Sequence, residues 1–170
     1  MHALECLLTR RSIRKYAETP VDPSLIEELI KYAMYAPSAA NTQPWQFIAI
    51  NDRKILQSIR TFHPYSRMLD TAPLAVLICG DESLEYGPGY MEMDCSAATQ
   101  NLLLAAHAHG LGSVWMGIHP VPERIAGMRR LTGLPETLHP ISLVVLGYPS
   151  DELPTTPERY KQERIHWNQY

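Results

Sequence analysis

The sequence predicts an α+β fold in which helices alternate with four strands in a three-layer sandwich. Three observations support it: apolar runs of strand length, longer segments with apolar residues at helical spacing, and Pro and Gly residues that separate them. The chain has 170 residues, 45% of them hydrophobic, and it contains no repeat or low-complexity tract. Since roughly 70% of the unfolded surface of such a chain is buried on folding, we expect a single domain over residues 1–170.

Two helices are expected at the start of the chain. Leucines at helical spacing predict a short helix over residues 4–10. A second helix begins at Asp22-Pro23, with a capping carboxylate and a proline in the first turn. It ends at Ala36-Pro37, because a residue before proline is pushed out of the helical region.

Four short apolar runs are predicted as strands: residues 46–50, 74–79, 113–116 and 141–146. The run at 74–79 has no polar alternation, which is typical of a strand buried on both faces. Between the first two strands, Asp52 is expected to cap a short helix.

The second half of the chain adds a long helix, a shorter one and an arm. The segment from about residue 90 to 109 is nearly apolar all round and rich in small residues, so it must be covered on all sides. It is either the central core helix of the monomer or packs against its twin in a dimer; both can hold, and we favour the dimer. A proline-bounded helix is expected over residues 122–131. Residues 154–170 are expected to form an extended arm whose aromatic side chains dock on another surface.

Composition excludes several classes of function. The net charge is −3 with 19% charged residues, so no basic face for nucleic acid is expected. The three cysteines are widely spaced, which indicates reduced, buried thiols rather than disulfides or a zinc site. No run approaches the ~18 apolar residues of a membrane span, and the pattern of a signal peptide is missing. We therefore expect a cytoplasmic protein without a metal or membrane partner. The two carboxylates of the long helix, Glu92 and Asp94, are interpreted separately, as a solvated or interface face.

The segment Arg10-Arg11-Ser12-Ile13-Arg14 is a candidate anion site. Three guanidinium groups in so short a stretch repel one another unless an anion lies between them. A phosphate accepts several charge-assisted bonds from such a group. The alternative is a solvated helix end, where arginine meets the helix dipole favourably and Ser12 acts only as a cap.

The loop Pro37-Ser38-Ala39-Ala40-Asn41-Thr42-Gln43-Pro44-Trp45 carries two carboxamides, those of Asn41 and Gln43. On extended backbone this spacing aims both side chains the same way, toward the donors and acceptors at the edge of a heteroaromatic ring. The alternative is a turn, because Asn and Thr initiate turns and Pro44 stiffens one.

Further motifs follow along nearly the whole chain: Gly112-Ser113-Val114-Trp115-Met116-Gly117, Leu146-Gly147-Tyr148-Pro149, and Arg159 with Arg164-Ile165-His166-Trp167-Asn168. In this order and spacing the motifs resemble the nitroreductase family of FMN-dependent oxidoreductases, in its short-chain branch. The resemblance implies a three-layer α/β/α sandwich with a mostly antiparallel central sheet. It also implies an obligate homodimer with FMN at the subunit interface and a C-terminal arm, residues 154–170, that extends to the partner subunit.

The resemblance assigns cofactor contacts by motif position. Arg10 and Arg159 would hold the phosphate, Ser12 would bond the phosphate or ribityl chain, and Arg11 would add backbone or charge contacts. Arg14 would lie near N1 and O2 of the flavin ring.

The other edges of the ring are assigned to two further segments. Met116 and Gly117 would offer backbone groups to the N5 and O4 side. The partner chain would contribute its loop to the ribityl and pyrimidine edges through Pro37, Ser38, Asn41 and Gln43.

The implied activity is transfer of reducing equivalents from NADH or NADPH through FMN to nitroaromatic, quinone or similar acceptors, by a ping-pong mechanism. No catalytic residue is expected from the protein, because the flavin carries the redox chemistry. No dinucleotide fingerprint occurs, so NAD(P)H would be a transient reductant. The short span at 56–73 predicts an open site. Two alternatives stay open: a flavin-binding carrier or sensor without turnover, and a relative repurposed for flavin fragmentation or dehalogenation.

Overall fold

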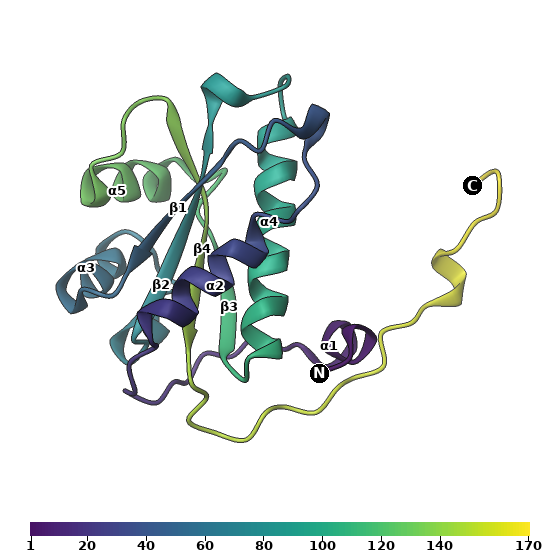
Figure 1. Ribbon diagram of the computed structural model, residues 1–170, viewed down its shortest axis with the longest axis horizontal. Coiled ribbons are helices and arrows are strands. Elements are labelled where there is room, and N and C mark those ends of the chain that lie inside the picture. Colours follow the sequence, from purple (N-terminus) through teal and green to yellow (C-terminus); the bar gives the residue numbers. More distant parts are fainter.

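The computed structural model describes residues 1–170 and is built around a four-stranded sheet (Figure 1). The strands are β1 (Trp45–Ile50), β2 (Leu74–Asp81), β3 (Gly112–Gly117) and β4 (Leu138–Gly147). They lie in the order β1-β2-β4-β3, and every neighbouring pair is antiparallel. The expectation of a mostly antiparallel sheet is confirmed.

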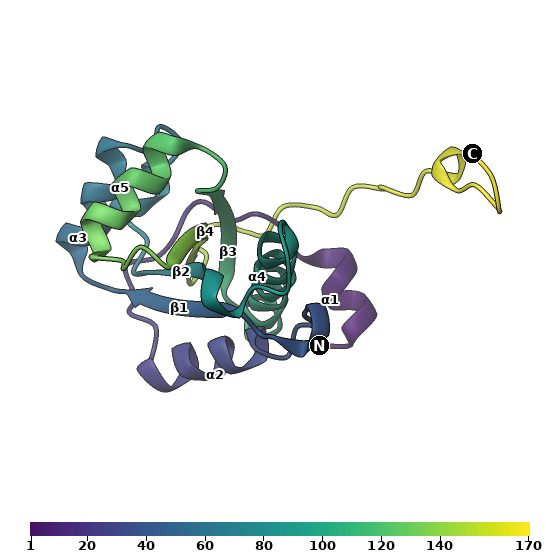
Figure 2. The same cartoon turned by 90° about the horizontal axis from the view of Figure 1, so that it is seen from above.

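Helices cover both faces of this sheet (Figure 2). One face is covered by α2 (Pro23–Ala33) and α4 (Tyr90–Ala108), and the other by α3 (Arg53–Ser58) and α5 (Pro122–Thr132). The short α1 (Ala3–Thr9) contacts α4. The three-layer sandwich predicted from the sequence is therefore confirmed.

The strand β2 separates two hydrophobic cores. Side chains alternate along a strand, so successive residues enter opposite layers. Leu74, Val76 and Ile78 belong to the core that includes α2 and α4, whereas Ala75, Leu77 and Cys79 belong to the core that includes α3 and α5. All six are buried, which confirms the predicted two-faced burial of this strand.

Local signals account for where the helices begin and end. The Asp22 carboxylate accepts a hydrogen bond from the Ser24 backbone N–H at 2.8 Å at the start of α2. Asp52 does the same for Lys54 and Ile55 at the start of α3. Gly110, with a φ of 77°, follows the end of α4, as a glycine beyond a helix end commonly does.

Short 3-10 helices occupy the connections: Ala39–Asn41, Ile59–Thr61, Arg67–Asp70, Glu82–Leu84 and Gln162–Arg164. Beyond Leu153 the chain is fully exposed and runs away from the sandwich (Figures 1 and 2). That course agrees with the extended arm expected for residues 154–170, and its docking on a partner remains a prediction. None of the helices combines the length and apolar character that crossing a membrane requires.

Candidate functional site

The Arg10–Arg14 segment lies against the edge strand β3. The Ile13 N–H donates to the Ser113 carbonyl at 2.9 Å, and Ser12 and Ser113 form a parallel bridge. A Cβ atom on Gly112 would lie 2.7 Å from Ile13 Cγ2, so only glycine permits this approach. Backbone bonds and close packing therefore fix the course of the arginine-bearing segment.

Three guanidinium groups meet at the start of this segment. Burial, followed by the charges of Arg159 and Arg11, lowers the pKa of Arg10. Arg11 donates to the carbonyls of Arg10 at 2.7 Å and of Thr155 at 3.3 Å, and its Nη2 is buried without a partner. None of the three arginines takes part in an ion pair. The two ends of the chain thus build a cationic cluster without a counter-charge.

The cluster is attached to the C-terminal half of α4. Thr9 Oγ1 is 2.8 Å from His107 Nε2, and the Cys6 thiol donates to the Leu104 carbonyl at 3.4 Å. Burial, together with the nearby Arg10 and Arg11, lowers the pKa of His107.

The carboxamide loop is attached to the opposite end of α4. The Ala39 N–H donates to Asp94 Oδ1 at 3.1 Å. Asp94 is only 7% exposed and its carboxylate anchors the loop, so the solvated alternative is wrong for Asp94, and a place at an interface stays a prediction. Asp94 and His107 are about 20 Å apart along the helix axis at the usual rise per residue. The loop and the arginine cluster of one chain are therefore well separated (Figure 1).

The conformation of the loop differs from the extended one expected for Asn41 and Gln43. Their φ angles are 58° and 50°, and that of Ala40 is 48°, so the chain turns through left-handed conformations. The two carboxamides are nevertheless neighbours, because Gln43 Nε2 donates to Asn41 Oδ1 at 3.0 Å. The Gln43 N–H donates to Ser38 Oγ at 3.0 Å, and Pro37 precedes this turn on the surface.

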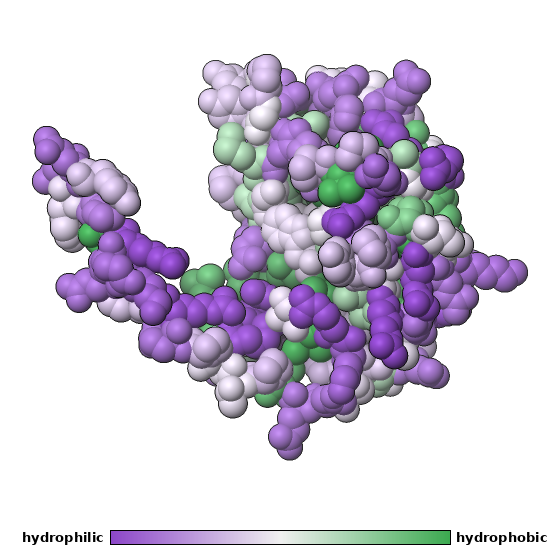
Figure 3. All heavy atoms as spheres, turned by 180° about the vertical axis from the view of Figure 1, so that it is seen from behind, coloured by the Kyte–Doolittle hydropathy of each residue, from purple (hydrophilic) through white to green (hydrophobic).

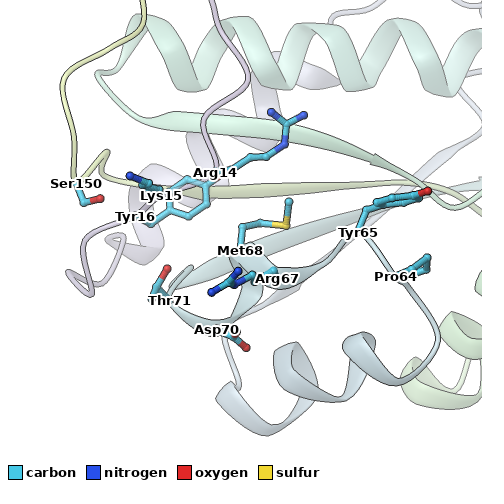
Figure 4. Close-up of a pocket in the computed structure, with 10 residues that line it drawn as sticks. All are labelled: Arg14, Lys15, Tyr16, Pro64, Tyr65, Arg67, Met68, Asp70, Thr71 and Ser150. Carbon is cyan, nitrogen blue, oxygen red and sulfur yellow. The ribbon is translucent and has the colours of Figure 1, made fainter.

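A cavity of about 910 Å³ opens beside the arginine segment (Figure 4). In Figure 4, Ser150 stands at one side of this cavity and Tyr65 at the other, with Arg14 and Met68 between them. The cavity is lined by Arg14, Lys15, Tyr16, Pro64, Tyr65, Arg67, Met68, Asp70, Thr71 and Ser150. The bulky residues of the 56–73 span thus form part of its wall.

A smaller hollow of about 180 Å³ adjoins the cavity and shares three of its residues. It is lined by Arg14, His63, Tyr65, Met68, Val114, Trp115, Met116, Gly117 and Arg124. Arg14 and the Met116-Gly117 backbone, which the family resemblance assigns to different edges of one ring, therefore border a common space.

A polar cluster surrounds the carbonyl of Gly117. Arg124 Nη1 donates to this carbonyl at 2.8 Å, and His63 Nε2 lies 3.2 Å from it. The Tyr65 N–H donates to His63 Nδ1 at 3.3 Å, so the ring proton is on Nε2 and that atom is the donor to Gly117. Burial, and next the charge of Arg124, lowers the pKa of His63.

Sequence analysis missed this cluster, because it singled out neither His63 nor Arg124. One local signal was present: Arg124 lies in the first turn of α5, where a cation opposes the helix dipole. No local pattern could place it beside Gly117.

The walls of the two spaces carry excess positive charge although the chain is acidic overall. Arg14, Arg67 and Arg124 have no ion-pair partner. Asp70, the only acidic residue on either wall, is paired with Arg60 at 2.6 Å. Both nitrogens of the His63 ring are hydrogen-bonded to backbone groups, those of Gly117 and Tyr65, and not to a hydroxyl or thiol. Such a site suits a ligand with anionic and flat parts, and it offers no nucleophile with an adjacent base.

A model of the Nitroreductase family matches residues 7–62 and 60–148. A protein of Methanothermobacter thermautotrophicus, provisionally named NADH dehydrogenase/NAD(P)H nitroreductase, is 46% identical over 166 residues. The match covers 98% of this chain and 86% of that protein.

Solved structures of similar proteins share the fold of this chain. A crystal structure from Parabacteroides distasonis, provisionally named NADH dehydrogenase/NAD(P)H nitroreductase, is 40% identical with a TM-score of 0.93, and 98% of each chain is covered. A provisionally named nitroreductase from Desulfovibrio desulfuricans, crystallised in complex with FMN, is 27% identical with a TM-score of 0.84. That match covers 98% of this chain and 96% of the other. The predicted fold is confirmed.

Proposed function

The chain belongs to the nitroreductase family, and we propose that it is an FMN-dependent NAD(P)H oxidoreductase with a nitroaromatic, quinone or similar acceptor. Its class as an NAD(P)H-dependent oxidoreductase agrees with the sequence expectation. One observation carries the proposal: Arg14 and the Met116-Gly117 backbone border the same hollow. Arg14 belongs to the segment that begins at the cluster of arginines without ion-pair partners.

The cationic cluster fits the phosphate end of FMN. Arg10, Arg11 and Arg159 are held together without a carboxylate, and the buried Nη2 of Arg11 has no partner. A phosphate between them would accept charge-assisted hydrogen bonds and remove the repulsion. Ser12, exposed on the same segment, is positioned to bond the phosphate or the ribityl chain.

The hollow fits the ring. When bound, FMN supplies hydride acceptance and donation at N5. Arg14 would hold the N1 and O2 edge of the ring, where its permanent positive charge would favour the reduced state. His63 and Arg124 hold the Gly117 carbonyl and so fix the backbone that would face the N5 and O4 side. For a nitro acceptor, NAD(P)H provides one hydride and solvent one proton, and the products are the nitroso compound and water.

We further propose that the functional unit is a homodimer. The ribityl chain is too short to join the arginine cluster to the carboxamide loop of the same subunit, because α4 separates them by about 20 Å. The loop with Pro37, Ser38, Asn41 and Gln43 therefore serves the partner's site. The C-terminal arm, which is exposed and contacts its own chain through the Arg11–Thr155 hydrogen bond, would embrace the partner.

The surface around α1 supports this assembly. Leu4, Leu7 and Leu8 are 63%, 57% and 68% exposed, beside an apolar hollow of about 480 Å³ between α1, α2 and α4. From behind, apolar atoms are visible between the arm and the body of the molecule (Figure 3). A contiguous exposed patch of this kind marks an interaction site.

An absorption spectrum of the purified protein tests the cofactor. We expect a yellow protein whose flavin is bleached by NADH or NADPH without oxygen and recovers when a nitroaromatic or quinone is added. A protein that stays colourless after incubation with excess FMN would refute the proposal. Reduction without any acceptor-stimulated reoxidation would instead identify a carrier or sensor.

A further inference from the structure

Arg124 is a cation beside the proposed ring site that the assigned cofactor contacts leave unused. We infer that Arg124 and Tyr65 form an acceptor subsite that selects planar aromatic acceptors with a carboxylate or similar anionic substituent. The inference rests on the proposed function and adds a substrate class to it.

The contacts of Arg124 leave part of its guanidinium group available. Its Nη1 donates to the Gly117 carbonyl at 2.8 Å, and its Nε is buried without a partner. A guanidinium group has five N–H donors in a fixed plane, and the Gly117 bond fixes the direction of that plane. Arg124 is therefore held in place by the protein with donors left for a ligand.

Tyr65 supplies the flat surface of the subsite. The Arg124 guanidinium carbon lies 5.8 Å from the centroid of the Tyr65 ring, a cation–π distance. Tyr65 is 73% exposed, so its ring stands at the mouth of the hollow rather than filling it. An aromatic acceptor that enters here can stack on Tyr65 while its carboxylate meets Arg124.

The surrounding charges favour an anion. None of the residues that line the smaller hollow is acidic. In the larger cavity, Asp70 is neutralised by Arg60 and Lys15 by Asp151, which leaves Arg14 and Arg67 as additional free cations. If Arg14 serves the flavin ring, Arg124 is the remaining free cation of the smaller hollow. A carboxylate entering it meets no like charge, and burial of that carboxylate is offset by the guanidinium group.

Steady-state kinetics with a matched pair of acceptors tests the inference. We would measure kcat/KM for 4-nitrobenzoate and for its neutral analogue 4-nitrobenzamide at low ionic strength. Arg124→Gln should lower the ratio of the 4-nitrobenzoate value to the 4-nitrobenzamide value about ten- to hundredfold, the range of a lost charged hydrogen bond; any loss common to both acceptors reports the Gly117 contact instead. Arg130→Gln, an exposed arginine of the same helix, removes the same charge and should change neither value.

Binding to the oxidised holoprotein gives a readout that does not depend on turnover. Calorimetric titration with benzoate and benzamide should show tighter binding of benzoate, lost in Arg124→Gln and largely kept in Arg124→Lys. Flavin content and the rate of reduction by NAD(P)H are measured for each variant, so that an altered cofactor site is recognised.

An unchanged ratio of the two acceptors in Arg124→Gln, with bound flavin that is still reduced, would overturn this inference alone. Equal affinity of the wild type for benzoate and benzamide would overturn it too. Failure to bind flavin, or to be reduced by NAD(P)H, would instead refute the proposed function on which it rests.

Discussion

At the scale of single residues, the fold holds the arginines at the start of the chain close enough to repel one another. Arg10 is partly buried next to two other cations, and this environment lowers its pKa. A solvated helix end, the alternative interpretation of the segment, would let the side chains spread into water. This environment supports the proposed anion site, because an anionic ligand would relieve both the burial and the repulsion.

Replacing Arg10 should weaken cofactor retention. We expect Arg10→Ala to reduce the binding free energy of FMN by about 1.5–3 kcal/mol, the range for loss of a charged hydrogen bond. Quenching of flavin fluorescence on titration into apoprotein measures the change. Arg130→Ala, on the exposed side of α5, is the control. Unaltered affinity in Arg10→Ala would remove Arg10 from the site.

The buried histidines predict sensitivity to acid. The pKa of His63 is lowered from its ordinary value of 6.5 by burial and by Arg124, so the unfolded chain binds a proton that the folded protein does not. The free energy of unfolding should therefore fall as the pH drops below about 6.5, until the folded-state pKa is reached. His107 adds a contribution of the same sign through burial, Arg10 and Arg11.

Thermal melting at about pH 7.5 and about pH 5.5 measures this loss. In His63→Gln the difference between the two melting temperatures should shrink. The control is His166→Gln in the exposed arm, which should keep the wild-type difference. An equal difference in His63→Gln and wild type would contradict the assignment.

At the scale of elements, β2 is the part of the fold that joins the two cores. Leu77 is fully buried at its centre, beneath α3 and α5. We expect Leu77→Ala to lower the free energy of unfolding by about 2–5 kcal/mol, because the removed atoms leave a cavity in a packed layer. Urea denaturation measures the effect, and the exposed Leu153→Ala, the same change outside the cores, should be within about 0.5 kcal/mol of wild type. A small effect at Leu77 would mean that this core is loosely packed.

Most elements could be predicted because their signals are local. Asp22 and Asp52 cap helices as expected, and the long apolar segment ends one residue from its predicted limit. The conformation of the carboxamide loop could not be predicted in the same way. A positive φ at Ala40 is unfavourable for any residue with a Cβ, and the anchor that supports this turn is Asp94, far along the chain.

The candidate site was predictable only where motifs are contiguous. The arginine segment was proposed from the chemistry of one short stretch, and the Met116-Gly117 backbone was assigned by the family resemblance of another. Arg124, Tyr65 and His63 converge only after β3 pairs with β4 and α5 folds over the sheet. Their contribution is a property of the tertiary structure, and neither spacing nor composition reveals it.

At the scale of the whole molecule, the proposed site needs two chains. Mixing two defective variants tests this directly: Arg10→Ala damages the phosphate end, and Asn41→Ala with Gln43→Ala damages the loop. In a mixed dimer both defects fall in one site and the other site is intact. Co-expression should therefore restore flavin to about half of the sites of the mixed dimers, measured by absorbance after tandem affinity purification with a different tag on each variant. No recovery in the mixed dimers would place each site within one chain.

Removing the arm tests its role. A chain truncated after Leu153 loses Arg159 and every aromatic residue of the arm, so we expect a weaker dimer and poorer flavin retention. Sedimentation velocity over a range of concentrations reports the dimer. If the truncated chain sediments as the intact one does at every concentration, the arm does not hold the assembly together.

The way Ile13 is hydrogen-bonded to Ser113 bears on how fast a cofactor is captured. The Arg10–Arg14 half of the grip is fixed to β3 by backbone hydrogen bonds before any encounter, whereas the half carrying Arg159 is exposed and is joined to this segment by the Arg11–Thr155 hydrogen bond. Most of the conformational entropy that is lost when the cofactor binds is therefore lost by the arm. Initial capture should then be quick and governed by long-range electrostatic attraction, and the slower closing of the arm should determine how long the captured molecule stays.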